Sequence, residues 1–565
     1  MRHHIIHILN ILLGCLLVLG IQTSDSQAAD AVLLQTEASS STYTESLAGT
    51  LDRINPVFAH LNPVNRDISS LIFEGLTQIN EFGEAVPDLA KEWSISSDGL
   101  EYVFVLRDDI KWQDGIPFNA DDVVYTMSIL ADDGFPGAQE LHKFWKSIEV
   151  QKVSDYVVRF RLVQSLGSFL HNLSIGLLPY HALNGTTAAE LPHHLFNLSP
   201  IGTGPYQLEA LHGSDGSASN QVDLRLAPTY RERPEGQSGY QIERIHFRIY
   251  PDFTTAIDAY EKNEVDGIAS DDRMSRIRLL NQPQTNIHTT IAPSVGILIY
   301  NWDEGEKRFF KDLRVREALS IGLNPSSAIQ AHLLNLAVPA VSPFLPGSWA
   351  YNDALPSPIY DPSRARTLLN GAFIVTGKEP DPEATEDPEQ EEAPESSGPI
   401  YQFKILVPVE SPALVAIAQE IATQWSNLNL DVQVDAVAEA VYRQRIEDGD
   451  FDTTILELAL SADPDVYRYW HPGQYPDGEN YGAVTDDKLA SIIERARQDT
   501  NGLNRQELYF EFQKIFMSRG IARPLYYPLY TYAQRPYLQN VQLGFISSPA
   551  DRFRNLQDWT MEKTG

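Results

Sequence analysis

The sequence predicts a mixed α/β protein built from several folding units, and three observations lead to this prediction. The chain has 565 residues, enough for two to four units at roughly 100–200 residues per domain. From Leu51 onward, short β-like runs alternate with amphipathic helical patterns. A strand pattern at 403–407 precedes a helical pattern from about 412 to 428 and a second strand pattern at 431–434. This β-α-β unit predicts a parallel sheet with a right-handed crossover.

Further elements follow from local signals. The run Tyr102–Leu106 is apolar and β-like, so we expect a strand there. Three helix starts are marked by capping residues, because Asn or Asp accepts the free N–H groups of a first turn and proline suits the first helical position. These capping residues are Asn119, Asn324 and Asp361.

The N-terminal residues 1–29 resemble a secretion signal. Arg2 precedes an apolar run from Ile5 to Ile21, and a small-residue cleavage site follows at Ala28 or Ala29. Lipidation of Cys15, which follows Leu12-Leu13-Gly14, is the alternative. We favour ordinary cleavage because the apolar run continues beyond Cys15. No other stretch reaches the roughly 20 apolar residues that span a bilayer.

Composition excludes several classes of function. Lys and Arg number 43 against 76 Asp and Glu, for a net charge of −33, and nucleic-acid binding requires basic surfaces. Cys15 is the only cysteine, so a chain cleaved after the signal has no thiol for disulfides or catalysis. Residues 378–399 are dominated by Glu, Asp, Pro, Ala and Ser, which predicts a disordered acidic surface insertion.

Catalytic signatures are missing from the sequence. It contains no GxSxG, HExxH, P-loop or GxGxxG pattern. The two carboxylates of Asp463-Pro464-Asp465 suit a turn with a helix cap better than acid–base catalysis. We therefore expect a protein that is not an enzyme and that needs no cofactor or metal.

A collinear series of motifs carries a specific resemblance. It spans about residues 55–545, and one such phrase alone would be weak. The motifs are Gly83–Ala90, Lys111–Gly115, Phe118–Val123, Ile201–Tyr206, Asn263–Asp266, Asp312–Leu319, Tyr360–Pro362, Gly449–Asp452, Asp463–Asp465 and Pro524–Tyr527. Together they resemble the family 5 extracellular solute-binding proteins of ABC importers, which include oligopeptide, dipeptide and nickel binders.

The resemblance implies a type II periplasmic-binding-protein fold, in which two lobes close over a ligand and an extra domain is inserted in lobe I. Carried over to this chain, lobe I comprises 30–72, 199–293 and 534–565. The extra domain comprises 73–198, and lobe II comprises 294–533. The resemblance also implies that the mature protein is a periplasmic monomer that binds a peptide or similar small solute and interacts with the permease subunits of an importer. A ligand that contacts both lobes then favours the closed state, which the protein reaches by a hinge motion.

The resemblance also suggests where the ligand lies. Peptide-binding relatives hold the α-amino group with an aspartate just before the Asp-Pro step, and here Leu460 or Ser461 takes that place. A buried ammonium without a carboxylate is costly, so we expect another acidic anchor among Asp271, Glu439 and Glu457. The remaining candidates for ligand contact are His60, Asn62, Ser270 and Tyr527.

Two alternatives stay open at the level of sequence. One is a metal- or metallophore-binding protein of the nickel type, although few histidines cluster in the sequence. The other is a sensory or chaperone-like extracytoplasmic protein that uses the same fold, because fold does not fix function.

Overall fold

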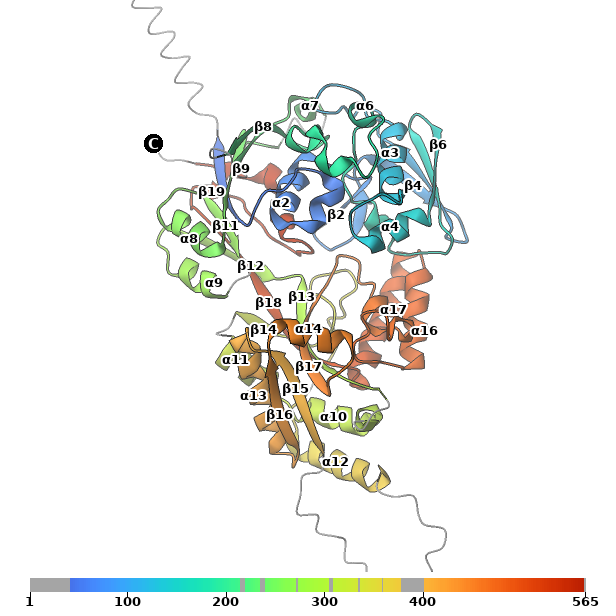
Figure 1. The fold of residues 1–565 in the computed structure, drawn as a ribbon, viewed down its shortest axis with the longest axis vertical. Helices are drawn as coiled ribbons and strands as arrows, with labels where there is room; N and C mark the ends of the chain where they lie inside the picture. The colour runs from blue at the N-terminus through green and yellow to red at the C-terminus, as the bar shows by residue number, and fades with distance from the viewer. Residues whose placement is uncertain are drawn as a thin grey trace, which may run out of the picture.

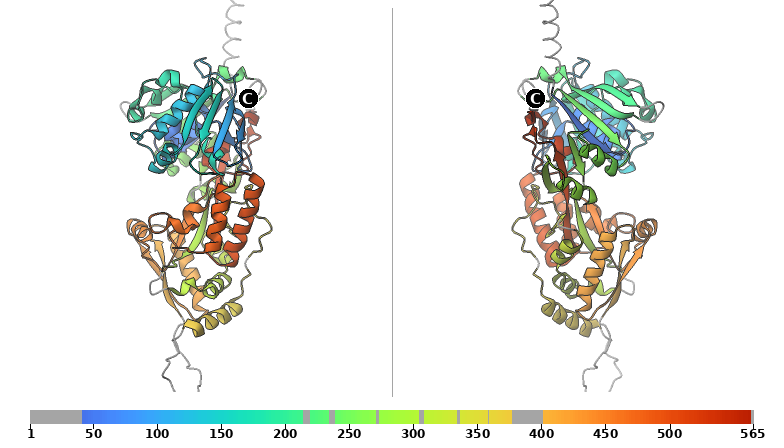
Figure 2. Two further views of the ribbon diagram at one scale, coloured as in Figure 1. Left: turned by 90° about the vertical axis from the view of Figure 1, so that its right-hand side faces the viewer. Right: turned by 90° about the vertical axis from the view of Figure 1, so that its left-hand side faces the viewer.

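The computed structural model describes residues 41–213, 219–233, 239–270, 273–303, 308–333, 336–357, 359–376 and 401–562. The predicted signal at 1–29 with Cys15, the predicted insertion at 378–399, and Asp271 lie outside these ranges. Two large hydrophobic cores divide the described chain. One is built from residues 43–249 and 530–559, and we call this part, with the adjoining residues 250–293, lobe I; the other is built from residues 295–527, and we call it lobe II. Figures 1 and 2 show the lobes one above the other.

One large sheet runs through both lobes, with 12 strands among the described residues. Its lobe I half has the order β18-β11-β1-β10-β9-β8, in which β1 pairs in parallel with β10 and β11. The bounds of these lobe I strands are β1 Thr42–Ala48, β8 Tyr206–Gly213, β9 Ser219–Leu226, β10 Arg244–Tyr250, β11 Gly267–Ser270 and β12 Asn286–Ile291.

The lobe II half of the sheet has the order β16-β15-β17-β13-β18. Strands β15 and β16 pair in parallel across α13, as the predicted β-α-β unit requires. The bounds are β13 Ser294–Tyr300, β14 Ala337–Pro339, β15 Gln402–Pro408, β16 Asp431–Val437, β17 Thr453–Ala459 and β18 Arg523–Gln534.

Strand β18 belongs to both lobes. Its first half pairs with β13 and β14 of lobe II, and its second half pairs with β11 and β12 of lobe I. The changeover is fixed by the amide of Ala292, which donates to the carbonyl of Pro528 at 2.8 Å. Prolines lack a donor N–H and interrupt a ladder, and Pro293 and Pro528 stand at this point. Strand β18 therefore runs unbroken between the lobes, whereas β12 and β13 are separated by Ala292 and Pro293.

A separate four-stranded sheet with the order β4-β5-β7-β6 lies within lobe I. Helices α3 and α4 adjoin it, and α3 packs against β6 and β7. It falls inside the range predicted for the extra domain, whose exact limits remain a prediction. The bounds are β4 Ala90–Ile95, β5 Glu101–Leu106, β6 Glu149–Ser154, β7 Val157–Arg161, α3 Ala120–Ala131 and α4 Gln139–Lys146. The short pairs β2 Thr77–Ile79 with β3 Ala85–Pro87, and β19 Leu538–Gln539 with β20 Thr560–Met561, complete the sheets.

Helices surround the two halves of the large sheet (Figure 1). In lobe I these are α2 Pro63–Ile72, α5 Phe169–Asn172, α6 Tyr180–Leu183, α7 Pro228–Arg231, α8 Phe253–Glu261 and α9 Arg273–Leu280, with 3-10 turns η1 Pro56–Leu61 and η6 Pro549–Phe553. In lobe II they are α10 Leu313–Ile321, α11 Pro325–His332, α12 Pro362–Thr376, α13 Pro412–Ser426, α14 Glu439–Glu447, α15 Tyr467–Trp470, α16 Asp487–Gln498 and α17 Gly502–Ser518. Among the described residues, no helix has the length and apolarity to cross a membrane.

The predicted mixed α/β, two-lobed architecture is confirmed, and so are its local signals. Asn119 caps α3 and forms a capping box with Asp122. Asn324 accepts from the Ser326 amide at the start of α11, and Asp361 accepts from the Arg364 amide at the start of α12. The predicted helix at about 412–428 ends slightly earlier, at Ser426.

Candidate functional site

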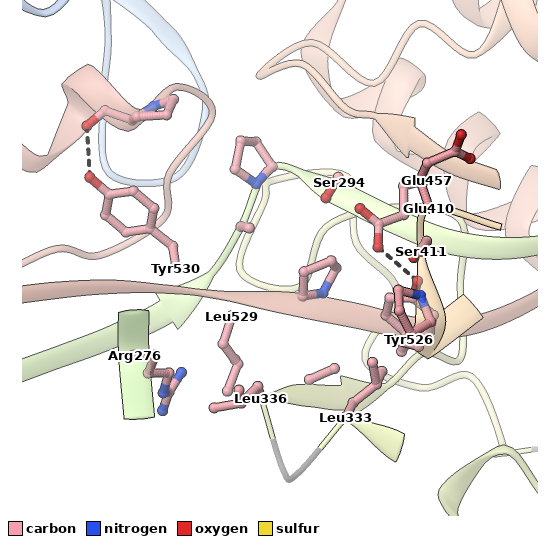
Figure 3. Close-up of a pocket in the computed structure, with 17 residues that line it drawn as sticks. Arg276, Ser294, Leu333, Leu336, Glu410, Ser411, Glu457, Tyr526, Leu529 and Tyr530 are labelled. Atoms are coloured by element: carbon pink, nitrogen blue, oxygen red, sulfur yellow. Dashed lines mark hydrogen bonds between the residues drawn. The ribbon is translucent and has the colours of Figure 1, made fainter. Parts of the chain in front are cut away.

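A large cavity lies where the two lobes meet, beside the changeover in β18. Its volume is about 730 Å³, within the range of roughly 300–1,000 Å³ usual for small-molecule sites. Lobe I contributes Arg276, Ala292, Tyr530 and Pro549. Lobe II contributes Leu333, Leu336, Ala337, Glu410, Ser411, Pro412, Ala413, Glu457 and Tyr526, and the join between the lobes contributes Pro293, Ser294, Pro528 and Leu529. A solute in this space would touch both lobes (Figure 3).

Strand β18 places two tyrosines in the cavity wall. Tyr526 donates its hydroxyl hydrogen bond to Glu457 Oε1 at 2.7 Å, and Tyr530 donates to the Pro549 carbonyl at 3.3 Å. The Tyr526 ring lies against Gly296 of β13, where an added Cβ would stand 2.3 Å from the ring. Because only glycine leaves that space, Gly296 lets the ring hold Glu457 at the cavity edge.

The acidic side of the cavity is formed at the carboxyl ends of β15 and β17. Glu457 is an exposed residue of β17, and Glu410 lies two residues beyond the end of β15. Glu410 Oε2 accepts from the Glu439 amide at 2.9 Å, which joins the start of α14 to the start of α13. Ser411, the N-cap of α13, makes no side-chain capping bond. Polar groups at the carboxyl ends of parallel strands commonly meet ligands in open α/β sheets.

The opposite side of the cavity is lined by a positively charged side chain, that of Arg276. Arg276 lies on α9 of lobe I, and its Nε and Nη1 atoms are buried with no hydrogen-bond partner among the described residues. Burial lowers the pKa of the Arg276 guanidinium from its usual value. Figure 3 shows Arg276 and Glu457 at opposite sides of the cavity, with Leu529 and Leu336 between them.

A second cavity of about 580 Å³ adjoins the first and shares Ser411 and Glu457 with it. Glu439, Tyr442 and Arg443 line it as well. Glu439 is already paired with Arg443 at 2.6 Å along α14. Of the two acidic candidates in described lobe II, Glu457 thus faces both cavities, whereas Glu439 has an ionic partner.

Leu460 and Ser461, one of which takes the place of the aspartate expected from the resemblance, line a smaller cavity. Its volume is about 190 Å³, and Ser547 is among its other lining residues. The Leu460 amide donates to the Pro293 carbonyl at 2.9 Å, which ties this loop to the join between the lobes. The Ser461 hydroxyl donates to the Asp463 carbonyl. Residues 460 and 461 carry no carboxylate, but Asp463 and Asp465 of the same loop line this cavity.

The other predicted residues lie apart from the large cavity. His60 is exposed in η1, and Asn62 caps α2 by accepting from the amides of Val64 and Asn65. Ser270 lines a lobe I cavity of about 250 Å³ that shares Tyr530 and Pro549 with the large one.

Tyr527 is buried and donates to the carbonyls of Ser342 and Phe344. Its neighbour Tyr526 lines the cavity instead, because successive strand residues face opposite sides. Sequence reasoning also passed over Arg276 and Glu410, and no local pattern marks Arg276.

A buried ionic cluster ties lobe II to the predicted extra domain. Arg505 of α17 donates to both carboxylate oxygens of Asp463 at 2.9 Å each and to the Gly167 carbonyl at 3.0 Å. His171 Nδ1 lies 3.2 Å from Asp463. Desolvation raises the pKa of Asp463, but the charges of Arg505 and His171 and the hydrogen bonds outweigh it, so the pKa falls below its usual value. Figure 2 shows α16 and α17 next to lobe I in both side views.

Within the described ranges, no group of three or more His, Cys, Asp or Glu residues is placed to hold a metal ion.

The fold and the cavity between the lobes define a two-lobed solute-binding protein, and comparison with known proteins gives the family. Residues 84–480 match the model of the bacterial extracellular solute-binding proteins, family 5. The chain belongs to this family.

Individual relatives are distant but cover most of the chain. The dipeptide-binding protein of Escherichia coli K12 is 26% identical over 466 residues, which are 78% of this chain and 80% of the relative. The structure of HbpA2 from Haemophilus parasuis has a TM-score of 0.75 at 21% identity, covering 92% of this chain and 100% of that one. The oligopeptide-binding protein AppA of Bacillus subtilis, solved with a nonapeptide, has a TM-score of 0.62 at 22% identity, covering 92% and 99%.

Proposed function

We propose that this chain captures a peptide or a similar small organic solute in the cavity between lobes I and II, and delivers it to the permease subunits of an ABC importer. The observation that carries the proposal is the cavity of about 730 Å³ lined from both lobes beside the changeover in β18. A ligand that contacts both lobes stabilises their closed arrangement over the open one. The function is binding without catalysis, and it needs no cofactor.

We propose that Glu457 is the residue that binds a cationic group of the solute. It faces both adjoining cavities, and Tyr526 holds one of its oxygens in place. A carboxylate that receives an ammonium forms a charge-assisted bond, roughly twice as strong as a neutral one. Ser461, Ser270 and Glu439 line neighbouring cavities and would contact only a larger solute.

The cellular setting follows from the family and the predicted signal. We propose export to the periplasm with cleavage of residues 1–29, and action there as a monomer. The alternative is that Cys15 is lipidated and anchors the protein to the membrane. Mass determination of the mature chain separates the two, because cleavage after Ala28 or Ala29 removes Cys15, whereas lipidation retains it with a mass increase.

The test is native mass spectrometry of the protein isolated from its own host, which should carry a co-purified small molecule. Adding that molecule at about 100 times its Kd should stabilise the protein by about 2.7 kcal/mol. Small-angle scattering should then report a smaller radius of gyration. A protein that carries no small molecule, and that no solute stabilises at high concentration, contradicts the proposal.

A further inference from the structure

We propose that lobe II binds a small monovalent anion such as chloride in its interior, between the guanidinium of Arg523 on β18 and the hydroxyl of Tyr300 on β13. Tyr300 is part of the hydrophobic core of lobe II. The site is separate from the cavity between the lobes, because Tyr300 stands six residues along β13 from Ser294, which lines that cavity, and this length of strand spans roughly 20 Å. The inference therefore goes beyond the proposed function and does not depend on it.

Arg523 carries a buried charge that no described side chain neutralises. The residue is 2% exposed, and its Nε and Nη1 atoms are buried without a hydrogen-bond partner among the described residues. Burial lowers the pKa of the Arg523 guanidinium to about 10, so the side chain stays positively charged at neutral pH. Arg519, four residues earlier, pairs with Asp486. A buried charge without a partner is costly, so Arg523 calls for a ligand of opposite charge.

The hydroxyl of Tyr300 is a second donor on the same face of the sheet. Strands β13 and β18 are antiparallel, and Leu298 lies opposite Arg523. Tyr300 is two residues beyond Leu298, so its side chain shares a face with Arg523 and lies diagonally across from it. The Tyr300 hydroxyl is buried, with no hydrogen-bond partner in the described chain. Burial raises the pKa of Tyr300, although the charge of Arg523 opposes the rise, so the hydroxyl keeps its proton at neutral pH and can donate it.

Arg316 of α10 adds a second positive charge to this region. Its charge, like that of Arg523, acts on the Tyr300 hydroxyl. Burial lowers the pKa of the Arg316 guanidinium to about 10, so this side chain is also charged at neutral pH, and its hydrogen bonds go to neutral backbone carbonyls. Carboxylates whose charge acts on Arg316 are already paired with other arginines, Asp486 with Arg519 and Asp312 with Arg314.

A small anion fits this arrangement better than a water molecule does. It can accept from both Arg523 and Tyr300, and it neutralises the buried charge. Water is neutral, and its own hydrogens would need acceptors in the same space. Neither residue lines any of the cavities described above, so the space is small and suits a monatomic ion. The chain has a net charge of −33, yet none of its described carboxylates pairs with Arg523, so the counter-ion comes from solution.

The test compares thermal unfolding of the full-length mature protein in sodium chloride and in sodium gluconate at equal ionic strength. Gluconate is too large for an enclosed monatomic site, so only chloride can bind there. A ligand that binds the folded state stabilises it. The unaltered protein should therefore unfold roughly 2–4 °C higher in chloride than in gluconate.

The variants separate a bound anion from a structural role of the arginine. Arg523→Met should lose the dependence on chloride and, because it removes an uncompensated buried charge, should unfold in gluconate no earlier than the unaltered protein. A purely structural role predicts lost stability in both salts. Tyr300→Phe keeps the ring and should weaken the chloride effect. Arg364→Met is the matched control, because that exposed side chain on α12 pairs with Glu317, and it should keep the full effect.

Crystals grown in sodium bromide locate the ion, because bromide scatters anomalously and is close to chloride in size. The expected result is an anomalous peak within hydrogen-bonding reach of Arg523 and Tyr300 that is absent from Arg523→Met. The proposal is overturned by bromide found only at exposed arginines, by a peak at Arg523 without any effect of chloride on unfolding, or by a chloride effect that survives in Arg523→Met. None of these outcomes bears on solute capture between the lobes, because no solute enters the test.

Discussion

Removal of the buried ion pair between Arg505 and Asp463 should destabilise the protein strongly. Arg505 is 4% exposed and Asp463 is 5% exposed. We expect Arg505→Met to leave the Asp463 carboxylate buried with its main charged partner gone. The same change strips the carbonyls of Gly167 and Ala496 of a donor each. Breaking a buried pair from one side costs about 3–5 kcal/mol, and the two lost carbonyl partners place the expected loss toward the upper end of that range.

The assay is urea unfolding of the purified protein, followed by circular dichroism and by tryptophan fluorescence, with linear extrapolation to water. Coincidence of the two signals shows whether the lobes unfold together. The control is Lys488→Met on α16, whose side chain is 55% exposed and pairs with Glu511 of α17, itself 44% exposed. An exposed pair contributes about 0–1 kcal/mol, so the control should unfold almost as the unaltered protein does.

A double variant sharpens the reasoning. Adding Asp463→Asn to Arg505→Met removes the stranded charge, so it should recover part of the stability lost in the single variant. The argument from buried charge is refuted if Arg505→Met lies within about 1 kcal/mol of the unaltered protein, or if the double variant is no more stable than the single one.

Three further predictions concern the same regions. Gly167→Ala should destabilise the contact between α17 and lobe I, because the added Cβ would lie 2.2 Å from a backbone oxygen. Gly502→Ala is the control, because its added Cβ would meet nothing within 4 Å. Thermal unfolding should show a lowered midpoint for Gly167→Ala only. Tyr526→Phe should weaken solute binding by roughly tenfold, as expected for one lost hydrogen bond to a carboxylate, with little change in the unfolding midpoint; calorimetry with the co-purified solute measures this. Because the folded-state pKa of Asp463 is lowered, its contribution to stability is present above the unfolded value near 4 and is lost as pH falls through the folded value. The stability gap between the unaltered protein and Asp463→Asn should therefore narrow as pH falls below about 4, and a gap that stays constant would contradict it.

Much of the fold could be predicted because its signals are local. The caps at Asn119 and Asn324 satisfy amides two or three residues away, and the run 403–434 carries its own β-α-β pattern. Such features depend on neighbouring residues, so the sequence displays them directly.

The candidate site was less predictable because it depends on contacts between distant segments. Glu457, a predicted ligand contact, lines the cavity, but Arg276 reaches the same space from α9 of the other lobe. In β18, the choice between Tyr526 and Tyr527 rests on the strand register and on the room left by Gly296. A one-residue shift moves a side chain to the opposite face. Because residues 526 and 527 are both tyrosine, the sequence pattern alone does not show which of them faces the cavity.

The place of β18 in the chain bears on biosynthesis. This strand is synthesised after every other strand of the large sheet, yet it lies in the interior of that sheet, between β13 and β11. Chains emerge at about 5–20 residues per second and fold progressively from the N-terminus. The two halves of the sheet cannot be joined through β18 before residues 523–534 have left the ribosome. The single sheet that spans both lobes is therefore completed only near the end of translation.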